Sequence, residues 1–141
     1  MNGKIFTLRL KTSEKLRATL QKFCADNGIL AGGIVTCVGA LSSATLRMAG
    51  ATPTAQDVRT YDEDFEIVSL VGTLTDNDCH LHLSIANRDG AVIGGHLKEA
   101  TINITTEIVI LDDRDKIYAT ELDDTGFTCL SIKERNDKEI K

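Results

Sequence analysis

The stretch of sequence that decides the fold lies at residues 80–97 and reads HLHLSIANRDGAVIGGHL. Before its centre, leucine and isoleucine occupy every second position, which is the pattern of a strand with one buried face. The centre, residues 87–90, reads NRDG and is typical of a tight turn. These features predict a β-hairpin with strands at residues 80–86 and 91–93, and therefore an antiparallel sheet.

All three histidines of the chain fall in this stretch. His80 and His82 are two positions apart on a strand, so their rings leave the same face of the sheet. The position of His96 depends on the turn. A three-residue loop with left-handed Gly90 sets His96 opposite His82, whereas a two-residue loop turns His96 to the other face. The pair Gly94-Gly95 also allows the strand to bend, so both registers stay open.

Three imidazoles that converge would leave a fourth position open on a divalent metal ion such as zinc. The candidate metal ligands are therefore His80, His82 and His96, in either a structural or a catalytic site. The alternative is three ordinary strand histidines that are exposed or hydrogen-bonded. The sequence contains no nucleophile elbow, phosphate loop or dinucleotide fingerprint, so it leaves open whether the protein is an enzyme.

Three further residues are candidates for the same site: Glu66, Glu107 and Cys79. Glu107 is the best candidate for a carboxylate that would act on metal-bound water, because it belongs to the polar face of a predicted strand. Cys79 is disfavoured as a ligand because adjacent residues on a strand point in opposite directions. A half-exposed strand carboxylate without a catalytic role is the alternative interpretation of Glu107.

The pattern outside the hairpin predicts an α+β single domain with a central antiparallel sheet and one main N-terminal helix. The helix is expected to start at a cap on Thr12 or Ser13 and to end at Asn27-Gly28. Residues 50–62 contain the one proline and read as a loop. Further strands are expected at residues 4–10, 34–38, 41–48, 65–75, 101–111, 118–121 and 128–132.

Length and composition support one domain. The chain has 141 residues, 42% of them hydrophobic, so residues 1–132 are expected to form the domain and residues 133–141 a charged C-terminal tail. No apolar run is long enough to span a membrane, and the N-terminus lacks a signal-peptide pattern, so we expect a cytoplasmic protein with no membrane partner. The four cysteines are widely spaced and read most simply as small core residues.

Charge argues against a dedicated nucleic-acid binder, since the formal net charge is −5. Residues 1–30 carry six basic and two acidic residues, so the predicted helix region is locally basic. That face could contact phosphate groups or an acidic partner. A solvated helix face explains the same residues without any partner.

Four blocks of the sequence together resemble the plants and prokaryotes conserved (PPC) domain, in their order and spacing. The resemblance extends over residues 4–132, and its blocks are residues 33–46, 65–74, 80–97 and 105–110. It implies a compact α+β domain that assembles as a homotrimer. The His-x-His and Gly-Gly-His patterns are similar to the stand-alone prokaryotic branch, without the AT-hook that precedes the domain in plants.

Family members are commonly described as predicted DNA-binding proteins, so the resemblance also implies a DNA-associated function. Three hypotheses follow. The protein is a homotrimer with a divalent-metal or small-ligand site at the histidines, a DNA-associated regulatory protein, or an oligomerisation module without a ligand. DNA is disfavoured as a partner because a trimer would carry a formal charge of −15.

Overall fold

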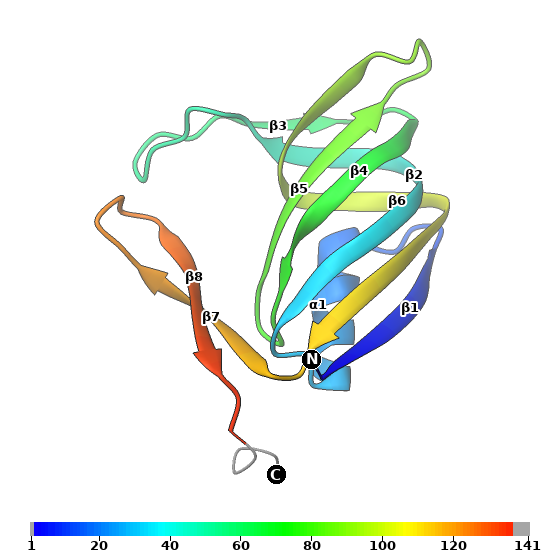
Figure 1. Ribbon diagram of the computed structural model, residues 1–141. Helices are drawn as coiled ribbons and strands as arrows, with labels where there is room; N and C mark the ends of the chain where they lie inside the picture. Colours follow the sequence, from blue (N-terminus) through cyan, green and yellow to red (C-terminus); the bar gives the residue numbers. More distant parts are fainter. Residues whose placement is uncertain (1, 137–141) are drawn as a thin grey trace.

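Six strands form one antiparallel sheet that closes on itself into a barrel-like shape (Figure 1). The computed structural model describes residues 2–136, and this part of the chain is mostly sheet with a single helix. The strand order is β1-β6-β5-β4-β2-β3, and an additional β6–β2 pairing closes the ring. The elements are β1 (Gly3–Lys11), α1 (Leu16–Asn27), β2 (Gly32–Arg47), β3 (Val58–Tyr61), β4 (Phe65–Leu74), β5 (Cys79–Ala86), β6 (Val92–Asp113), β7 (Lys116–Leu122) and β8 (Thr128–Glu134).

Two long strands, β2 and β6, close the barrel by pairing with each other. The sequence pattern predicts each of them as two shorter strands. The strands predicted at residues 91–93 and 101–111 are parts of β6, and those predicted at residues 34–38 and 41–48 are parts of β2. The β2–β6 ladder shifts register at four places, including the Gly39/Ala40 step. A Cβ on Gly39 would lie 2.4 Å from the carbonyl oxygen of Thr105, so glycine permits the close approach of β6. Bulges of this kind let a strand bend without ending.

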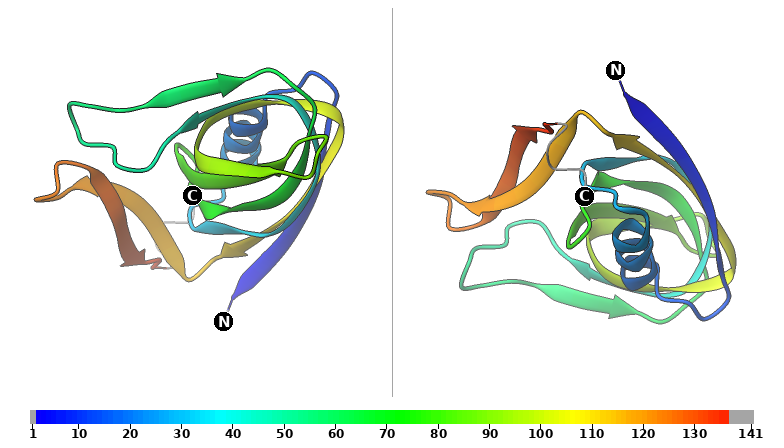
Figure 2. Two further views of the ribbon diagram at one scale, coloured as in Figure 1. Left: turned by 90° about the horizontal axis from the view of Figure 1, so that it is seen from above. Right: turned by 90° about the horizontal axis from the view of Figure 1, so that it is seen from below.

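The helix α1 lies inside the outline of the curved sheet in both views of Figure 2. It buries Leu16, Leu20 and Cys24, which recur at helical spacing, and it ends at the left-handed Gly28 as predicted. The predicted cap on Thr12 or Ser13 is wrong. Lys15 is the N-cap and makes no side-chain hydrogen bond to the helix, while the Ser13 backbone N–H donates to the Ile102 carbonyl oxygen at 2.9 Å.

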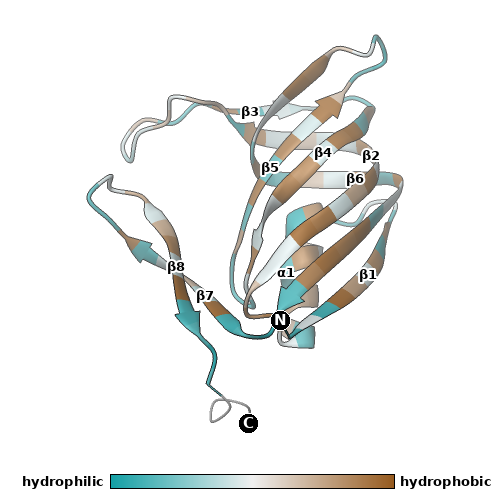
Figure 3. Cartoon of the chain, in the orientation of Figure 1, coloured by the Kyte–Doolittle hydropathy of each residue, from teal (hydrophilic) through white to brown (hydrophobic). Residues whose placement is uncertain are grey.

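Aliphatic side chains from the inner faces of the strands and from α1 fill the core. The hydrophobic positions alternate along the strands in Figure 3, as half-buried strands require. Cys24 and Cys79 are buried in this core, but Cys37 is only half-buried and Cys129 is exposed. The largest fully buried side chains are Leu10, Leu16, Leu20, Ile29, Leu41, Leu46, Leu74, Leu81, Leu83, Ile85, Leu97 and Ile102.

The last two strands, β7 and β8, form a separate two-stranded sheet that projects from the barrel (Figure 1). The strands predicted near residues 118–121 and 128–132 are therefore present, and they pair with each other. The strand β8 continues to Glu134, and the remainder of the predicted tail includes residues 137–141, which lie outside the described residues. The loop predicted at residues 50–62 contains the short strand β3. In the described chain, no helix has the length and apolar character needed to cross a membrane.

Candidate metal centre

The turn at residues 87–91 sets the register of the histidine hairpin. Gly90 is left-handed with φ of 76°, and the Asn87 N–H donates to the Ala91 carbonyl oxygen at 3.0 Å. This is the three-residue loop of the two alternatives that the sequence left open. His82 therefore lies directly opposite His96 in the β5–β6 ladder. Because facing residues of a ladder share a face, both rings project from the outer surface of the barrel.

The three imidazole rings come together at this place. Their centroids are separated by 5.1 Å for His80 and His82, 5.2 Å for His80 and His96, and 5.5 Å for His82 and His96. One ring nitrogen of each histidine lies within 4.8 Å of the other two. His80 and His82 are exposed and His96 is half-buried, so the cluster opens to solvent on one side. The predicted convergence of the three histidines is confirmed.

The environment favours the neutral form of two of these imidazoles, His80 and His96. Burial, with the nearby Arg47 guanidinium as the next cause, lowers the pKa of His96 to about 4. Burial and the adjacent His82 lower the pKa of His80 from its ordinary value. Neutral imidazole is the form that binds a metal ion, since protonation removes the lone pair. At neutral pH, His80 and His96 are therefore in the form that can bind a cation.

An unpartnered nitrogen of His96 and the spacing of the three rings also fit a metal ion. The Nδ1 atom of His96 is buried and has no hydrogen-bond partner among the described residues. An unpartnered buried polar atom costs about 1–3 kcal/mol, which a bound ion near the ring would reduce. Zinc–nitrogen bonds of about 2.0–2.1 Å set the nitrogens of a tetrahedral site about 3.4 Å apart. The three nitrogens lie within 4.8 Å of one another, so side-chain rotation would have to shorten these distances to reach that spacing.

The other candidate ligands lie elsewhere. Glu107 is exposed on β6 and faces Arg9 on one neighbouring strand and Val38 on the other. Glu66 is also exposed and faces Ala86, at the far end of β5 from His80. The third candidate, Cys79, is buried in the core, as its position next to His80 on the strand predicts. None of them joins the histidine cluster, so Glu107 is not a carboxylate beside it, and the alternative interpretation of Glu107 as a strand carboxylate without a catalytic role agrees with its position.

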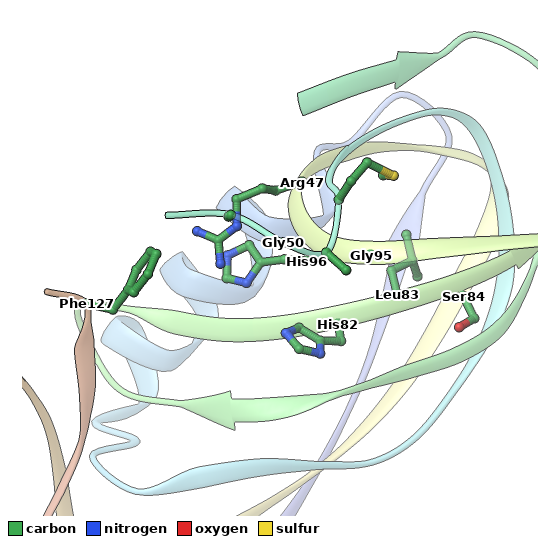
Figure 4. Close-up of a pocket in the computed structure, with 11 residues that line it drawn as sticks. Arg47, Gly50, His82, Leu83, Ser84, Gly95, His96 and Phe127 are labelled. Carbon is green, nitrogen blue, oxygen red and sulfur yellow. The ribbon is translucent and has the colours of Figure 1, made fainter. Parts of the chain in front are cut away.

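Two cavities adjoin the histidines and contain residues that the sequence analysis did not identify. Arg47, His96 and Phe127 line both cavities, which have volumes of about 480 and 640 Å³. In Figure 4 the Arg47 side chain lies beside the His96 ring and Phe127 faces it from the β7–β8 side. Lys98 lines the larger cavity and lies two positions after His96 on the same strand face. That spacing could have indicated Lys98 from sequence, but nothing local in the sequence indicates Arg47 or Phe127.

A closed antiparallel sheet with one helix and an open cluster of three histidines defines a small β-rich protein with a candidate metal centre. The chain belongs to the family of the Plants and Prokaryotes Conserved domain, whose family model matches residues 1–112. The resemblance of the sequence to the PPC domain is therefore confirmed.

Several solved structures share the fold. A hypothetical protein from Salmonella cholerae-suis is 28% identical, with a TM-score of 0.90 over 96% of each chain. A metal-containing protein from Archaeoglobus fulgidus is 29% identical, with a TM-score of 0.80 over 89% of this chain and 91% of its own. A protein from Bacteroides thetaiotaomicron with the provisional name of DNA-binding protein is 25% identical, with a TM-score of 0.79 over 90% of this chain and 91% of its own.

A similar segment also occurs in a larger protein. The bifunctional protein GlmU of a Synechococcus strain is 34% identical over 132 residues, which is 92% of this chain. The chain spans about a fifth (21%) of that curated relative.

Proposed function

We propose that this protein is a homotrimeric member of the family that binds a divalent metal ion, zinc or a similar ion, at His80, His82 and His96. The observation that carries the proposal is the convergence of one nitrogen from each ring within 4.8 Å. The metal-containing relative from Archaeoglobus fulgidus, of the same fold, supports it. Three protein ligands leave one position of a tetrahedral ion for water or for a ligand. No described carboxylate lies within the cluster, so the proposal assigns no catalytic residue.

Metal analysis of the untagged protein tests the site. The wild-type chain is expected to bind one divalent ion, and His82→Ala to lose most of it, because two ligands hold an ion far less tightly than three. Arg88→Ala is the matched control, since Arg88 lies in the same hairpin at its turn and outside both cavities. Equal metal content in the wild type and in His82→Ala would exclude His82 as a ligand and contradict the three-histidine site.

The trimer is supported by an apolar patch on the outside of the barrel. The side chains of Val35, Val38, Val68 and Val71 on β2 and β4 are each more than half exposed. These strands are neighbours in the sheet, so the four valines form one surface, which we call the valine patch. Exposed apolar patches of this kind are typical of interfaces between proteins, and a second copy of this chain is the occupant that we propose.

Light scattering tests the assembly. The expected mass is three times the 15.3 kDa of one chain, and Val38→Lys is expected to reduce it because a buried ammonium would lose its hydration. Val92→Lys is the matched control, since Val92 is equally exposed but lies at the start of β6, outside the valine patch. A wild-type monomer would contradict the assembly.

Association with DNA is a second candidate function. The provisional name of the relative from Bacteroides thetaiotaomicron and the basic residues within positions 1–30 favour it. Two of these basic side chains are already engaged in ion pairs, since Arg17 pairs with Asp78 at 2.9 Å and Lys22 with Asp26 at 2.5 Å. A gel shift titrated with salt tests this candidate, which requires binding that weakens steeply as salt rises.

A further inference from the structure

The larger cavity beside the histidines has an excess of positive charge. Arg17, Arg47 and Lys98 line it, and Asp78 is its one carboxylate among the described residues. The Asp78 carboxylate accepts a hydrogen bond from the Arg17 guanidinium at 2.9 Å, so these two charges compensate each other. Arg47 and Lys98 have no carboxylate partner within salt-bridge distance in the described chain. Two uncompensated cations thus face one cavity of a protein whose net charge is −5.

The fold fixes these cations relative to the histidines. Arg47 faces His96 across the β2–β6 ladder, as His82 does across the β5–β6 ladder. Three neighbouring strands therefore present His82, His96 and Arg47 in one row on the outer face. Lys98 follows His96 on the same face, and the Arg47 guanidinium and the imidazole lie side by side in Figure 4. A metal ion at the histidines would add two further positive charges to this row.

The β7–β8 hairpin supplies the opposite wall of the cavity. The Arg47 guanidinium carbon lies 5.6 Å from the centre of the Phe127 ring, a cation–π contact that holds both side chains in place. Cys129, Leu130 and the threonines at 120, 125 and 128 complete this wall. The volume of about 640 Å³ is in the range of cavities that bind small molecules. One wall is therefore cationic, and the other is apolar with hydroxyl groups.

We propose that this cavity binds a small organic anion. Its carboxylate or phosphate head group lies between the metal ion and the side chains of Arg47 and Lys98, and its apolar body lies against Phe127 and Leu130. The planar guanidinium matches the two oxygens of such a head group. The inference rests on the proposed metal site, because the fourth metal position supplies one of the contacts to the head group.

The test uses the full chain loaded with Co²⁺, whose visible absorption reports on the ligands of the ion. Acetate, butyrate and inorganic phosphate are titrated separately, and calorimetry measures each dissociation constant. Arg47→Met is expected to weaken the binding of acetate or phosphate at least tenfold while the cobalt spectrum persists. The anion affinity of Arg47→Lys is expected to lie between those of the wild type and Arg47→Met, since lysine keeps the charge and loses the two-point contact. Arg88→Met, which alters an arginine outside the cavity, is the matched control and is expected to bind like the wild type.

Comparison of the anions tests the two walls separately. Butyrate is expected to bind up to about fifteenfold more tightly than acetate, because it has two more methylenes and burial of each against Phe127 strengthens binding about fourfold at most. Phe127→Ala is expected to remove that gain. Whichever of acetate and phosphate binds more tightly identifies the head group, and either result supports the oxyanion site.

The outcomes separate the two proposals. Failure of Co²⁺ to bind would overturn both the metal site and the anion site. Cobalt binding with no response to any of the three anions, or with equal anion affinity in wild type and Arg47→Met, would overturn the anion site alone. In that case the metal site would stand.

Discussion

Arg47 and His96 face each other in the β2–β6 ladder, so a guanidinium lies beside one of the three imidazoles that form the candidate metal centre. The positive charge opposes protonation of His96 and adds to the effect of burial on its pKa. The same charge would attract an anion that binds to the metal. One cross-strand pair therefore connects the protonation state of a ligand with the proposed binding of an anion.

The first prediction concerns that pair in the metal-free protein. The pKa of His96 is expected at about 4, and Arg47→Met is expected to raise it toward the ordinary value of 6.5 because a neighbouring positive charge is removed. Proton NMR titration of the imidazole resonances measures the change. Arg88→Met serves as the control, and an unchanged His96 titration in Arg47→Met would contradict the electrostatic coupling.

The second prediction is a loss of stability of the metal-free fold in mild acid. The unfolded chain protonates His96 near pH 6.5, whereas the folded chain does so only at about pH 4. Between these values the unfolded state binds more protons, so the free energy of unfolding decreases as the pH falls from 6.5 to 4 and is highest above 6.5. Urea denaturation at a series of pH values measures this slope. His96→Gln is expected to flatten it, and an equal slope in that variant would assign the loss to other groups.

The third prediction is stabilisation by metal. At a free zinc concentration one hundred times the dissociation constant, the folded state gains about 2.7 kcal/mol. For a chain of this size we expect a rise in melting temperature of about 5–10 °C, and a chelator should reverse it. Differential scanning calorimetry measures both changes. His80→Ala should melt at the same temperature with zinc and with chelator, and a zinc-dependent shift of full size in that variant would exclude His80 as a ligand.

The fourth prediction concerns Gly72, which lets β4 approach β5 next to the histidines. A Cβ at this position would lie 1.9 Å from the carbonyl oxygen of His80, a contact that forces the backbone to move. Gly72→Ala is expected to cost about 1–3 kcal/mol of stability and to weaken metal binding, because it displaces His80. Gly33→Ala is the matched control, since its Cβ would meet no atom closer than 3.8 Å. Denaturant unfolding measures the stability of both variants, and metal titration measures their affinity. Equal losses in Gly72→Ala and Gly33→Ala would contradict the prediction.

The fifth prediction is an order of thiol reactivity. Burial raises the pKa of Cys24 to about 12 and of Cys79 to about 11, so both thiols stay protonated and shielded in the native protein. Cys129 is exposed on β8 and is expected to react first with iodoacetamide. Its hydrogen bond with Asp123 raises its pKa, so the reaction should accelerate toward alkaline pH. Peptide mapping by mass spectrometry identifies the labelled residue, and early labelling of Cys24 would show that the core opens.

Local pattern in the sequence was sufficient to predict the hairpin and its histidines. The alternation at residues 80–86 predicts which side chains are buried, because neighbouring residues on a strand point to opposite faces. The glycine of the turn is compatible with the loop that brings His96 opposite His82, but the sequence left a second register open, and the structure decided between the two. Gly28 likewise predicts the end of the helix. These features depend on residues that are close together in the chain, so their physical causes can be read from a short segment.

The tertiary structure alone decided what surrounds the histidines. Arg47 reaches His96 only because β2 pairs with β6 when the sheet closes, and Phe127 reaches Arg47 only because the projecting β7–β8 hairpin brings its turn next to the end of β2. The same closure places Glu107 between Arg9 and Val38, away from the histidines. The sequence analysis had considered Glu107 as a candidate carboxylate beside the metal. Pairing between distant strands depends on the packing of the whole core and on bulges such as the one at Gly39. No local pattern encodes that geometry, and it determines which charges meet at the site.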